Sequence, residues 1–545
     1  MTSFRNKLLA AFLCFGVIGN ATAQDKIYLV PPVQLLPLKK METNAYGIIV
    51  PVKTDILNEN VWKNAAYPVT TAKFSQIGNQ LPAKAEELRL TLLKLTADPP
   101  QGTAGQSFIT LKLQTLFDRG QFEDAHRLLQ KIPEKTRTDV QNKIHADLLL
   151  TNDLQAACFL TQKESDDSFW QNLSAVCAAF NQEEDKAFLA LELLKEQGLL
   201  TPFISHAVDH FLYHKPLKTK PDEITPLTAA IWRSSKKSLL DLKDPDGKIW
   251  YKTMIVRDET IPVEKRLAIA EELVQLGIIA PSKLRTYYQQ VSFKNRKSGT
   301  FTAEIQRAQY VQQAAALSSQ MTDNLKKQAL IKKGLRSAKK ARVSYAFSAA
   351  IKDILETITP DLDTLAKSAD LIEAFALAGL KDQVFDWQKK AEILFPVSET
   401  TAYGWYFGEL LQPDKNKRFL ISSLENMMAY AEKHQTIDTA FISAVDRLML
   451  TFKALDMIPA DESWHYTSFP ENSDEDEFVN REQPLSLENK PVGDIVLEAL
   501  RELNGTYIGL LNALEILQSA GLQQEAVLLA LQSIDLILPP VQTHE

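Results

Sequence analysis

Three histidines recur at intervals of four in the segment FISHAVDHFLYH, a spacing that could present imidazoles to a metal ion. His206, His210 and His214 would share one stripe of a helix, about 80° wide. The apolar stripe of the same helix is centred roughly 90° away, so the histidines flank the buried face. The sequence has no HExxH pattern and no assignable third ligand. We therefore expect a solvent-exposed face; a metal site at His206 and His210 is the alternative, and no cofactor is predicted.

A second candidate for chemistry is the cysteine pair Cys158 and Cys177. Each is expected on a helix, and polar residues 164–167 would reverse the chain between them. In such an antiparallel hairpin, two cysteines come within the short Cα separation that a disulfide needs. A structural disulfide is predicted, and two buried free thiols are the alternative. The spacing excludes a CxxC-type redox or zinc site.

Two groups of aromatic residues could grip a sugar or a peptide. Trp405 and Tyr406 belong to a dense aromatic cluster, for which core packing is the default and ligand binding the alternative. Trp464 and His465 begin an acidic loop, and loops carry function more often than cores do. All four are candidate binding residues.

Two segments each contain a cluster of charged residues of one sign, the first basic and the second acidic. Lys and Arg recur from Lys326 to Arg342 without an intervening acid, a run that could meet anionic lipid, an acidic partner or the chain's own acidic loop. These residues scatter around most of the expected helix, so a solvated face is favoured. The cluster Asp474–Glu477 lacks the alternating spacing of calcium ligands and is expected to be a solvated linker.

Catalytic signatures are missing from the sequence. It contains no nucleophile elbow, P-loop, dinucleotide-binding fingerprint or zinc-peptidase motif. No catalytic residue is therefore assigned.

The first 23 residues have the pattern of an export signal. Arg5 and Lys7 form a basic start, an apolar stretch follows, and Ala21-Thr22-Ala23 offers a cleavage site after Ala23. That stretch is too short to span a bilayer comfortably, and no later window is apolar enough. We expect a periplasmic protein with no transmembrane segment in its mature chain. The net charge of −7 gives no indication of a nucleic-acid partner.

A succession of expected helices positions these residues. The composition favours helix over strand, and 545 residues exceed one compact core. In a recurring pattern, one helix ends in Gly or Asn and the next begins one or two residues later. The segments with this pattern are 117–125, 150–157, 180–187, 377–384 and 519–526. Such units predict an all-α fold, an α-solenoid of degenerate helix–turn–helix, tetratricopeptide-like repeats with an extended N-terminal arm.

The expected organisation has five parts, of which the long loop is either functional or mobile. They are a signal peptide at 1–23, an extended arm at 24–67, a helical repeat array at 68–459, an acidic irregular loop at 460–493 and a C-terminal helical cap at 494–545.

The order of these features resembles uncharacterised exported α-helical-repeat proteins of α-proteobacteria, sometimes labelled antifreeze-glycopeptide-like. The matching features are Val61-Trp62, the PPQG break at 99–102, AAC…FWQNLSAVC and the closing LQSAGLQQEAVLLALQ. The resemblance covers most of the mature chain. It implies a periplasmic helical-repeat protein and no established activity.

Three functional hypotheses follow. The favoured one is a non-catalytic periplasmic scaffold or protein-binding module for envelope proteins. The alternative is an envelope enzyme, for example one acting on cell-wall glycan, built on a helical solenoid; it requires a buried Glu or Asp facing a cleft. The third is a purely structural protein.

Overall fold

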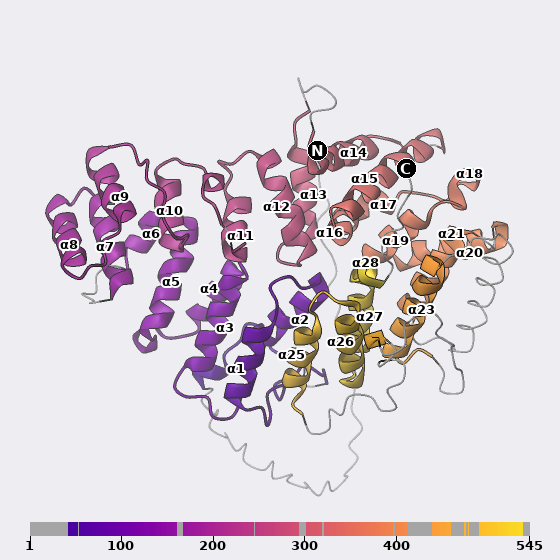
Figure 1. Ribbon diagram of the computed structural model, residues 1–545, viewed down its shortest axis with the longest axis horizontal. Helices are drawn as coiled ribbons and strands as arrows, with labels where there is room; N and C mark the ends of the chain where they lie inside the picture. Colours follow the sequence, from indigo (N-terminus) through magenta and orange to yellow (C-terminus); the bar gives the residue numbers. More distant parts are fainter. Residues whose placement is uncertain are drawn as a thin grey trace, which may run out of the picture. The chain divides into compact units, whose positions relative to one another are not determined.

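A computed structural model describes residues 42–52, 54–160, 167–244, 246–293, 301–318, 321–395, 398–412, 439–458, 473–475, 478 and 490–537 (Figure 1). The predicted signal peptide, its cleavage after Ala23 and the arm up to residue 41 lie outside these ranges. Trp464, His465 and most of the predicted acidic loop also lie outside them.

Within the described ranges the regular structure is helical, which confirms the predicted all-α class. No strand is found there, and the only β-type contacts are two isolated bridges, Ile49 with Leu95 and Ala66 with Gln101. The first helices are α1 (Tyr67–Gln76), α2 (Ala83–Lys94), α3 (Ser107–Asp118), α4 (Phe122–Gln130), α5 (Asp139–Asn152), α6 (Leu154–Cys158), α7 (Ser168–Phe180), α8 (Glu184–Glu196) and α9 (Pro202–Tyr213).

The helices continue through the middle and the end of the chain. The middle ones are α10 (Pro226–Ser234), α11 (Ile249–Arg257), α12 (Val263–Gln275), α13 (Pro281–Gln290), α14 (Ala303–Ala315), α15 (Met321–Lys340), α16 (Ser344–Ala350), α17 (Lys352–Leu355), α18 (Leu362–Leu365), α19 (Ala369–Leu377), α20 (Lys381–Leu394) and α21 (Glu399–Leu411). The last ones are α23 (Thr439–Ala454), α25 (Val492–Glu502), α26 (Tyr507–Ser519), α27 (Gln523–Gln532) and α28 (Ile534–Ile537). The short 3-10 helices of the described ranges are η1 (Thr43–Ala45), η2 (Glu134–Thr136) and η3 (Leu239–Asp241).

A helix begins after each of the five turns that the sequence pattern predicts, but the turns are closed in different ways. Gly120 ends α3 with a φ of 67°, and a Cβ there would lie 2.2 Å from Oγ1 of Thr253 on α11. After α7, the left-handed residue is Gln182 and not Asn181. After α5, the extended Asp153 caps α6 through a hydrogen bond to the amide of Gln155. α5 thus ends at Asn152 as the pattern predicts, but neither Asn152 nor Asn181 is the left-handed residue expected to end a helix.

The last helices pack against the first. α25 contacts α1 and α2, and α27 contacts α2 as well as α19 and α21. The buried hydroxyl of Thr70 donates to the carboxylate of Asp494 at 3.0 Å, and Nζ of Lys73 donates to the Asp494 carbonyl at 3.1 Å. The amide of Lys84, at the start of α2, donates to Oε1 of Gln532 at 2.6 Å. Residues more than 400 positions apart thus share one interface.

The tightest point of this interface is Gly493 against Trp62. Trp62 is 1% exposed, and the Gly493 amide donates to the carbonyl of Val61 at 2.9 Å. A Cβ on Gly493 would lie 2.5 Å from the Trp62 ring. The buried apolar residues form a continuous cluster that runs from Val61 to Ile537, so the described helices share one core.

Lys112 fixes the N-terminal segment against α2 and α3. Its side chain is fully buried, and Nζ donates to the carbonyls of Tyr46 and Leu95, each at 3.1 Å. Burial lowers the pKa of Lys112 to about 7. A neutral amine keeps two N–H groups, which matches the two carbonyl acceptors.

The structure also corrects the boundaries of the predicted acidic loop at 460–493. Helix α25 begins at Val492, so the last two residues of the predicted loop are helical. Phe478 is only 4% exposed and belongs to the core cluster. At least part of the segment expected to be a solvated linker is therefore packed against the helices.

We expect Gly493→Ala to lower the free energy of unfolding by about 1–3 kcal/mol, because the new methyl group overpacks the contact with Trp62. Chemical denaturation of the full chain measures this effect. Gly78→Ala is the matched control, since a Cβ there meets nothing within 4 Å. Equal stability of the two variants would contradict the close packing of α25 on Trp62.

Candidate protein-binding surface

The histidines of α9 are engaged with the segment that follows their own helix. Nδ1 of His206 lies 2.6 Å from Oγ1 of Thr219, and Nδ1 of His210 lies 2.7 Å from the carbonyl oxygen of Lys215. His206 is exposed and His210 is half-buried. No group of three or more His, Cys, Asp or Glu side chains able to hold a metal is found among the described residues. The two histidines act here as hydrogen-bonding partners of the turn after α9.

Trp405 and Tyr406 are buried in α21 and line no open surface. They are 6% and 2% exposed, and both rings contact Phe452 of α23, with centroid distances of 5.8 and 5.6 Å. Their burial favours core packing, the default interpretation, over ligand binding. Trp464 and His465 lie outside the described residues.

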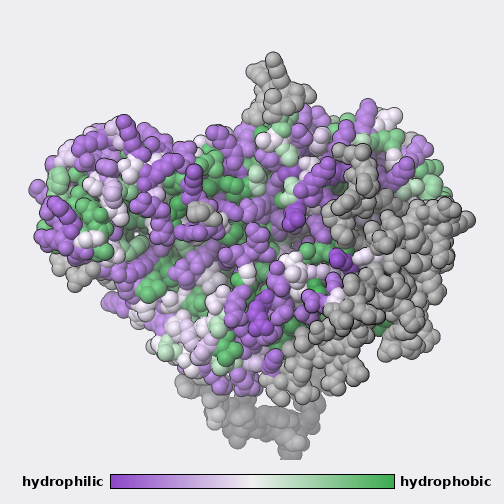
Figure 2. All heavy atoms as spheres, viewed as in Figure 1, coloured by the Kyte–Doolittle hydropathy of each residue, from purple (hydrophilic) through white to green (hydrophobic). Residues whose placement is uncertain are grey.

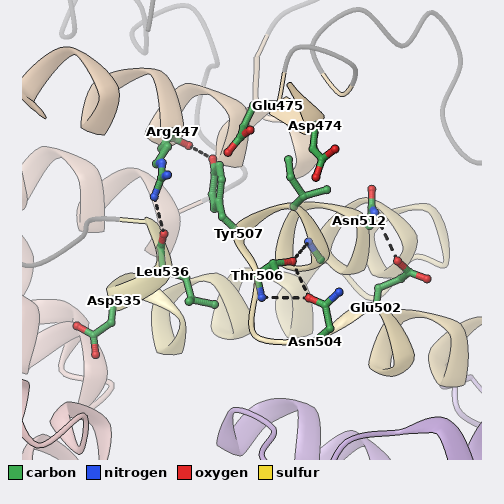
Figure 3. A pocket seen from close by; sticks show the side chains of 12 residues that line it. Arg447, Asp474, Glu475, Glu502, Asn504, Thr506, Tyr507, Asn512, Asp535 and Leu536 are labelled. Atoms are coloured by element: carbon green, nitrogen blue, oxygen red, sulfur yellow. Dashed lines mark hydrogen bonds between the residues drawn. The ribbon is translucent and has the colours of Figure 1, made fainter. Parts of the chain in front are cut away.

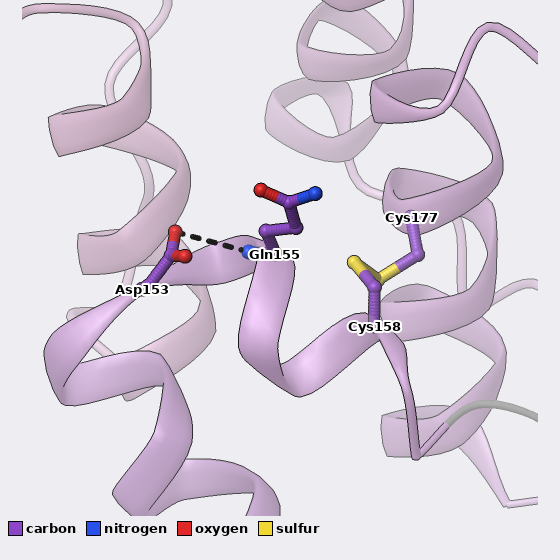
Figure 4. Close-up of a disulfide and its surroundings, with 4 residues drawn as sticks. All are labelled: Asp153, Gln155, Cys158 and Cys177. Atoms are coloured by element: carbon purple, nitrogen blue, oxygen red, sulfur yellow. Dashed lines mark hydrogen bonds between the residues drawn. A yellow bond between two sulfur atoms is a disulfide. The ribbon is translucent and has the colours of Figure 1, made fainter.

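Cys158 and Cys177 form the predicted disulfide (Figure 4). The bond joins the last residue of α6 to the last turn of α7, with 5.4 Å between the two Cα atoms. Cys177 is 2% exposed and belongs to the core cluster, against which Cys158 packs. The bond therefore ties the α7–α8–α9 group to α6 and, through it, to α5.

Among the described residues, burial raises the pKa of four carboxyl groups, those of Asp118, Asp147, Glu373 and Asp535, which is the direction that a catalytic acid needs. Burial raises the pKa of Glu373, although its ion pair with Lys339 at 3.1 Å opposes the shift. Glu373 lines a space of only about 20 Å³, which has room for a water molecule but not for a sugar ring. Burial, together with the charge of Asp118, raises the pKa of Asp147 to about 7. Oδ1 of Asp147 is buried and has no hydrogen-bond partner within the described part of the chain.

A polar pocket of about 500 Å³ lies where α23, α26 and α28 meet (Figure 3). The guanidinium of Arg447 lies 5.0 Å from the ring centre of Tyr507 and donates to the carbonyl of Leu536 at 3.3 Å. Its charge is thus used to hold the three helices together. Figure 3 shows that the surrounding carboxylates do not converge, since Asp535 points away from Asp474 and Glu475. The pocket shows no paired acid and base.

The basic helix α15 uses part of its positive charge in packing, so the expectation of a solvated face is only half correct. Four of its cations, whose positions spread over roughly 180° of the helix, hold α15 to the segment from Thr357 to Glu373. The contacts there are Lys327 Nζ to Thr357 Oγ1 at 3.1 Å, Lys332 Nζ to the Lys367 carbonyl at 2.7 Å, Arg336 to Asp370 at 3.4 Å and Lys339 to Glu373 at 3.1 Å. Burial alone would lower the pKa of Lys339, but Glu373 outweighs it and the pKa is raised.

Helix α15 also carries Lys326, Lys333 and Lys340, which repeat every seven residues and therefore lie on one stripe. All three are exposed. Lys326 has a long contact of 3.9 Å with Asp323, and no ion pair is found for Lys333 or Lys340 within the described ranges. Lys333 and Lys340 are thus exposed cations without an ion pair among the described residues, and Lys326 is an exposed cation with only a long one.

Next to this stripe, α14 and α15 enclose a shallow hollow of about 510 Å³, called here the α14–α15 groove. Its lining is apolar apart from the lysines and one amide. The lining residues are Gln313, Ala316, Leu317, Lys326, Ala329, Leu330 and Lys333. An apolar floor beside two exposed ammonium groups, of which only Lys326 has an ion pair and that a long one, suits an apolar ligand that also carries carboxylates.

Comparison of this chain with models of protein families, with curated proteins and with solved structures finds no match. None of the described helices combines the length and apolar character needed to cross a membrane.

We expect Cys158→Ser to lower the free energy of unfolding by about 3 kcal/mol under oxidising conditions, because the cross-link over 19 residues is lost. Denaturant titration with and without a reductant measures the effect. With the reductant, wild type and variant should converge. Unchanged stability of the variant without reductant, or two reactive thiols in the native protein, would contradict the disulfide.

Asp147→Asn should change how stability depends on pH. Because the folded-state pKa of Asp147 is raised from 3.8 to about 7, the folded state holds the proton more tightly, and the wild type loses stability as pH rises from about 4 to 7. The variant lacks this loss and should be more stable by about 4 kcal/mol at pH 8, at about 1.4 kcal/mol per pH unit between the two pKa values, with a smaller difference at pH 4. Urea unfolding at pH 4, 6 and 8 provides the measurement. A stability difference that does not vary with pH would contradict the shifted pKa.

Proposed function

We propose that this protein is a non-catalytic periplasmic scaffold that binds envelope proteins, and that the α14–α15 groove is one of its binding surfaces. The single observation that carries the proposal is the groove itself, an apolar hollow of about 510 Å³ bordered by Lys326 and Lys333. Grooves of this kind between two helices receive amphipathic helices of partner proteins.

Two features support a periplasmic location. The N-terminal sequence has the basic, apolar and small-residue pattern of an export signal. The disulfide between Cys158 and Cys177 is of the kind that persists in oxidising compartments.

The finer fold that we propose is an α-solenoid of degenerate, tetratricopeptide-like helical pairs. Adjacent helices in sequence pack together in pairs such as α3 with α4, α7 with α8, α14 with α15 and α20 with α21. The contacts of α25 and α27 with α1 and α2 go beyond a simple stack, in which each repeat touches only its neighbours.

The partner should present a helix with one apolar stripe and carboxylates beside it. The stripe would lie over Leu317 and Leu330, and the carboxylates would meet Lys326 and Lys333. Because these lysines are exposed, the charges contribute more to the choice of partner and to the association rate than to affinity. The apolar contact supplies most of the binding free energy.

An enzyme acting on cell-wall glycan is the second candidate, and Asp147 is the observation that favours it. A carboxyl group with a pKa of about 7 beside a second carboxylate, Asp118, has the electrostatic character of a general acid. Turnover of purified peptidoglycan that is lost in Asp147→Asn, while the variant stays folded, would establish the enzyme. Absence of turnover in the wild type would leave the scaffold as the supported function.

The scaffold is tested by crosslinking in cells. A photoreactive amino acid at Ala329, which is exposed in the groove, should capture an envelope protein, identified by mass spectrometry. Adding Lys326→Glu and Lys333→Glu should reduce this capture about tenfold or more, because the new glutamate side chains of the groove would repel the carboxylates of the partner.

Lys381→Glu with Lys389→Glu is the matched control, because both lysines are exposed on α20 and the change in net charge is the same. The control should capture as much partner as the wild type. Equal capture by the groove variant and the control variant would contradict the assignment of the groove as a binding surface.

A further inference from the structure

Helix α8 exposes an unusually apolar outer face. Phe188, Leu189 and Leu193 are 42%, 64% and 43% exposed, and Leu199 just after the helix is 41% exposed. The packing partners of α8 are α7 and α9, which cover only the side that carries Ala187 and Leu194. In Figure 2, hydrophobic green spheres gather at the end of the molecule where Figure 1 places α7 and α8. Exposed leucines at this density indicate a contact surface.

The same face carries an acidic stripe. Asp185, Glu192 and Glu196 are exposed, and their positions on the helix fall within about 40° of one another. Within the described ranges, no hydrogen bond or ion pair is found for these three carboxylates; the local pair is instead Lys186 with Glu183. Leu189 and Leu193 border the stripe on one side and Phe188 borders it on the other. The α8 face is therefore a helix surface with apolar side chains and unneutralised carboxylates.

This face complements the α14–α15 groove in both charge and spacing. Asp185 and Glu192 are seven residues apart, as are Lys326 and Lys333, so both pairs are separated by roughly 10 Å along their helices. Leu189 and Leu193 would meet the apolar floor at Leu317 and Leu330. α8 thus has the features required of a groove partner.

We propose that a second copy of this chain docks the face of its α8 against the α14–α15 groove of the first. The inference rests on the proposed role of the groove as a protein-binding surface. Figure 1 shows α8 and α15 apart in the same copy, so the pairing must form between copies. The contact joins two different surfaces and leaves one groove and one α8 face unoccupied on each dimer, so further copies can add in the same way.

Sedimentation velocity of the purified full chain over a range of protein and salt concentrations tests the proposal. We expect association that strengthens with protein concentration and weakens with added salt, because the opposing charges are exposed and therefore screened. A wild-type chain that remains monomeric at every concentration reached would overturn the proposal.

Charge reversal separates this contact from nonspecific association. Lys326→Glu with Lys333→Glu, or Asp185→Lys with Glu192→Lys, should each weaken self-association about tenfold or more, since like charges then face each other. An equal mixture of the two variants should associate about as well as the wild type, because the α8 face of each is opposite in charge to the groove of the other. A mixture that stays monomeric would overturn the pairing of these surfaces.

A matched pair of leucine substitutions tests the apolar part of the contact. Leu189→Ser should weaken association, whereas Leu362→Ser on α18 should not, although the two leucines are 64% and 66% exposed. Equal effects of the two variants would overturn the role of α8. Thermal unfolding of all variants confirms that each remains folded.

The result also distinguishes this inference from the proposed function. A monomeric wild type whose capture of an envelope protein at Ala329 still depends on Lys326 and Lys333 would leave the scaffold in place and exclude only the second copy as occupant.

Discussion

The packing of the C-terminal helices on the N-terminal ones is the constraint on which the rest of the described structure depends. Gly493 gives α25 its approach to Trp62, and the buried hydroxyl of Thr70 satisfies the carboxylate of Asp494. Without this interface, the apolar faces of α1, α2, α25 and α27 would be exposed to water, at a cost of about 25 cal/mol per Å² of apolar area. With it, the helices that the structure describes lie against a shared core.

Buried charges mark places where neighbouring helices of the chain meet. Glu86 of α2 is fully buried and accepts hydrogen bonds from Arg119 at the end of α3, at 2.9 and 3.1 Å. Glu271 of α12 is bonded in the same way by Arg307 of α14, at 2.8 Å, and by the hydroxyl of Tyr288, at 2.7 Å. Desolvation makes such pairs poor sources of stability, but removal of one partner leaves an uncompensated buried charge. They therefore penalise wrong helix pairings more than they stabilise the correct one.

The helical class, the turns and the disulfide could be predicted because they depend on local sequence. The helix after each predicted turn and the bond between Cys158 and Cys177 follow from short-range patterns of small, polar and apolar residues. Burial of Trp405 and Tyr406 could not be predicted, because it depends on contact with Phe452. The sequence around Trp405 gives no information about where Phe452 lies in the fold. Packing of the first helices on the last was missed for the same reason.

The candidate surface could be predicted from the sequence only in part. The spacing of Lys326, Lys333 and Lys340 was visible in the sequence, but it was hidden among cations that the structure pairs with the segment from Thr357 to Glu373. Only the packing of α15 shows which lysines are neutralised and which remain exposed. The acidic stripe of α8 was equally visible, and its meaning also depends on which face of the helix is covered.

The central claim is that the described chain is one body, held together by the contact between its first and last helices, on which the groove is displayed. Native-state hydrogen exchange of the full chain tests this claim most directly. The most protected amides of α1, α2, α25 and α27 should exchange with the same free energy of opening as those of α12 and α19. If α25 and α27 opened at a much lower free energy while α12 and α19 stayed protected, the C-terminal helices would be a separate unit and the claim would be wrong.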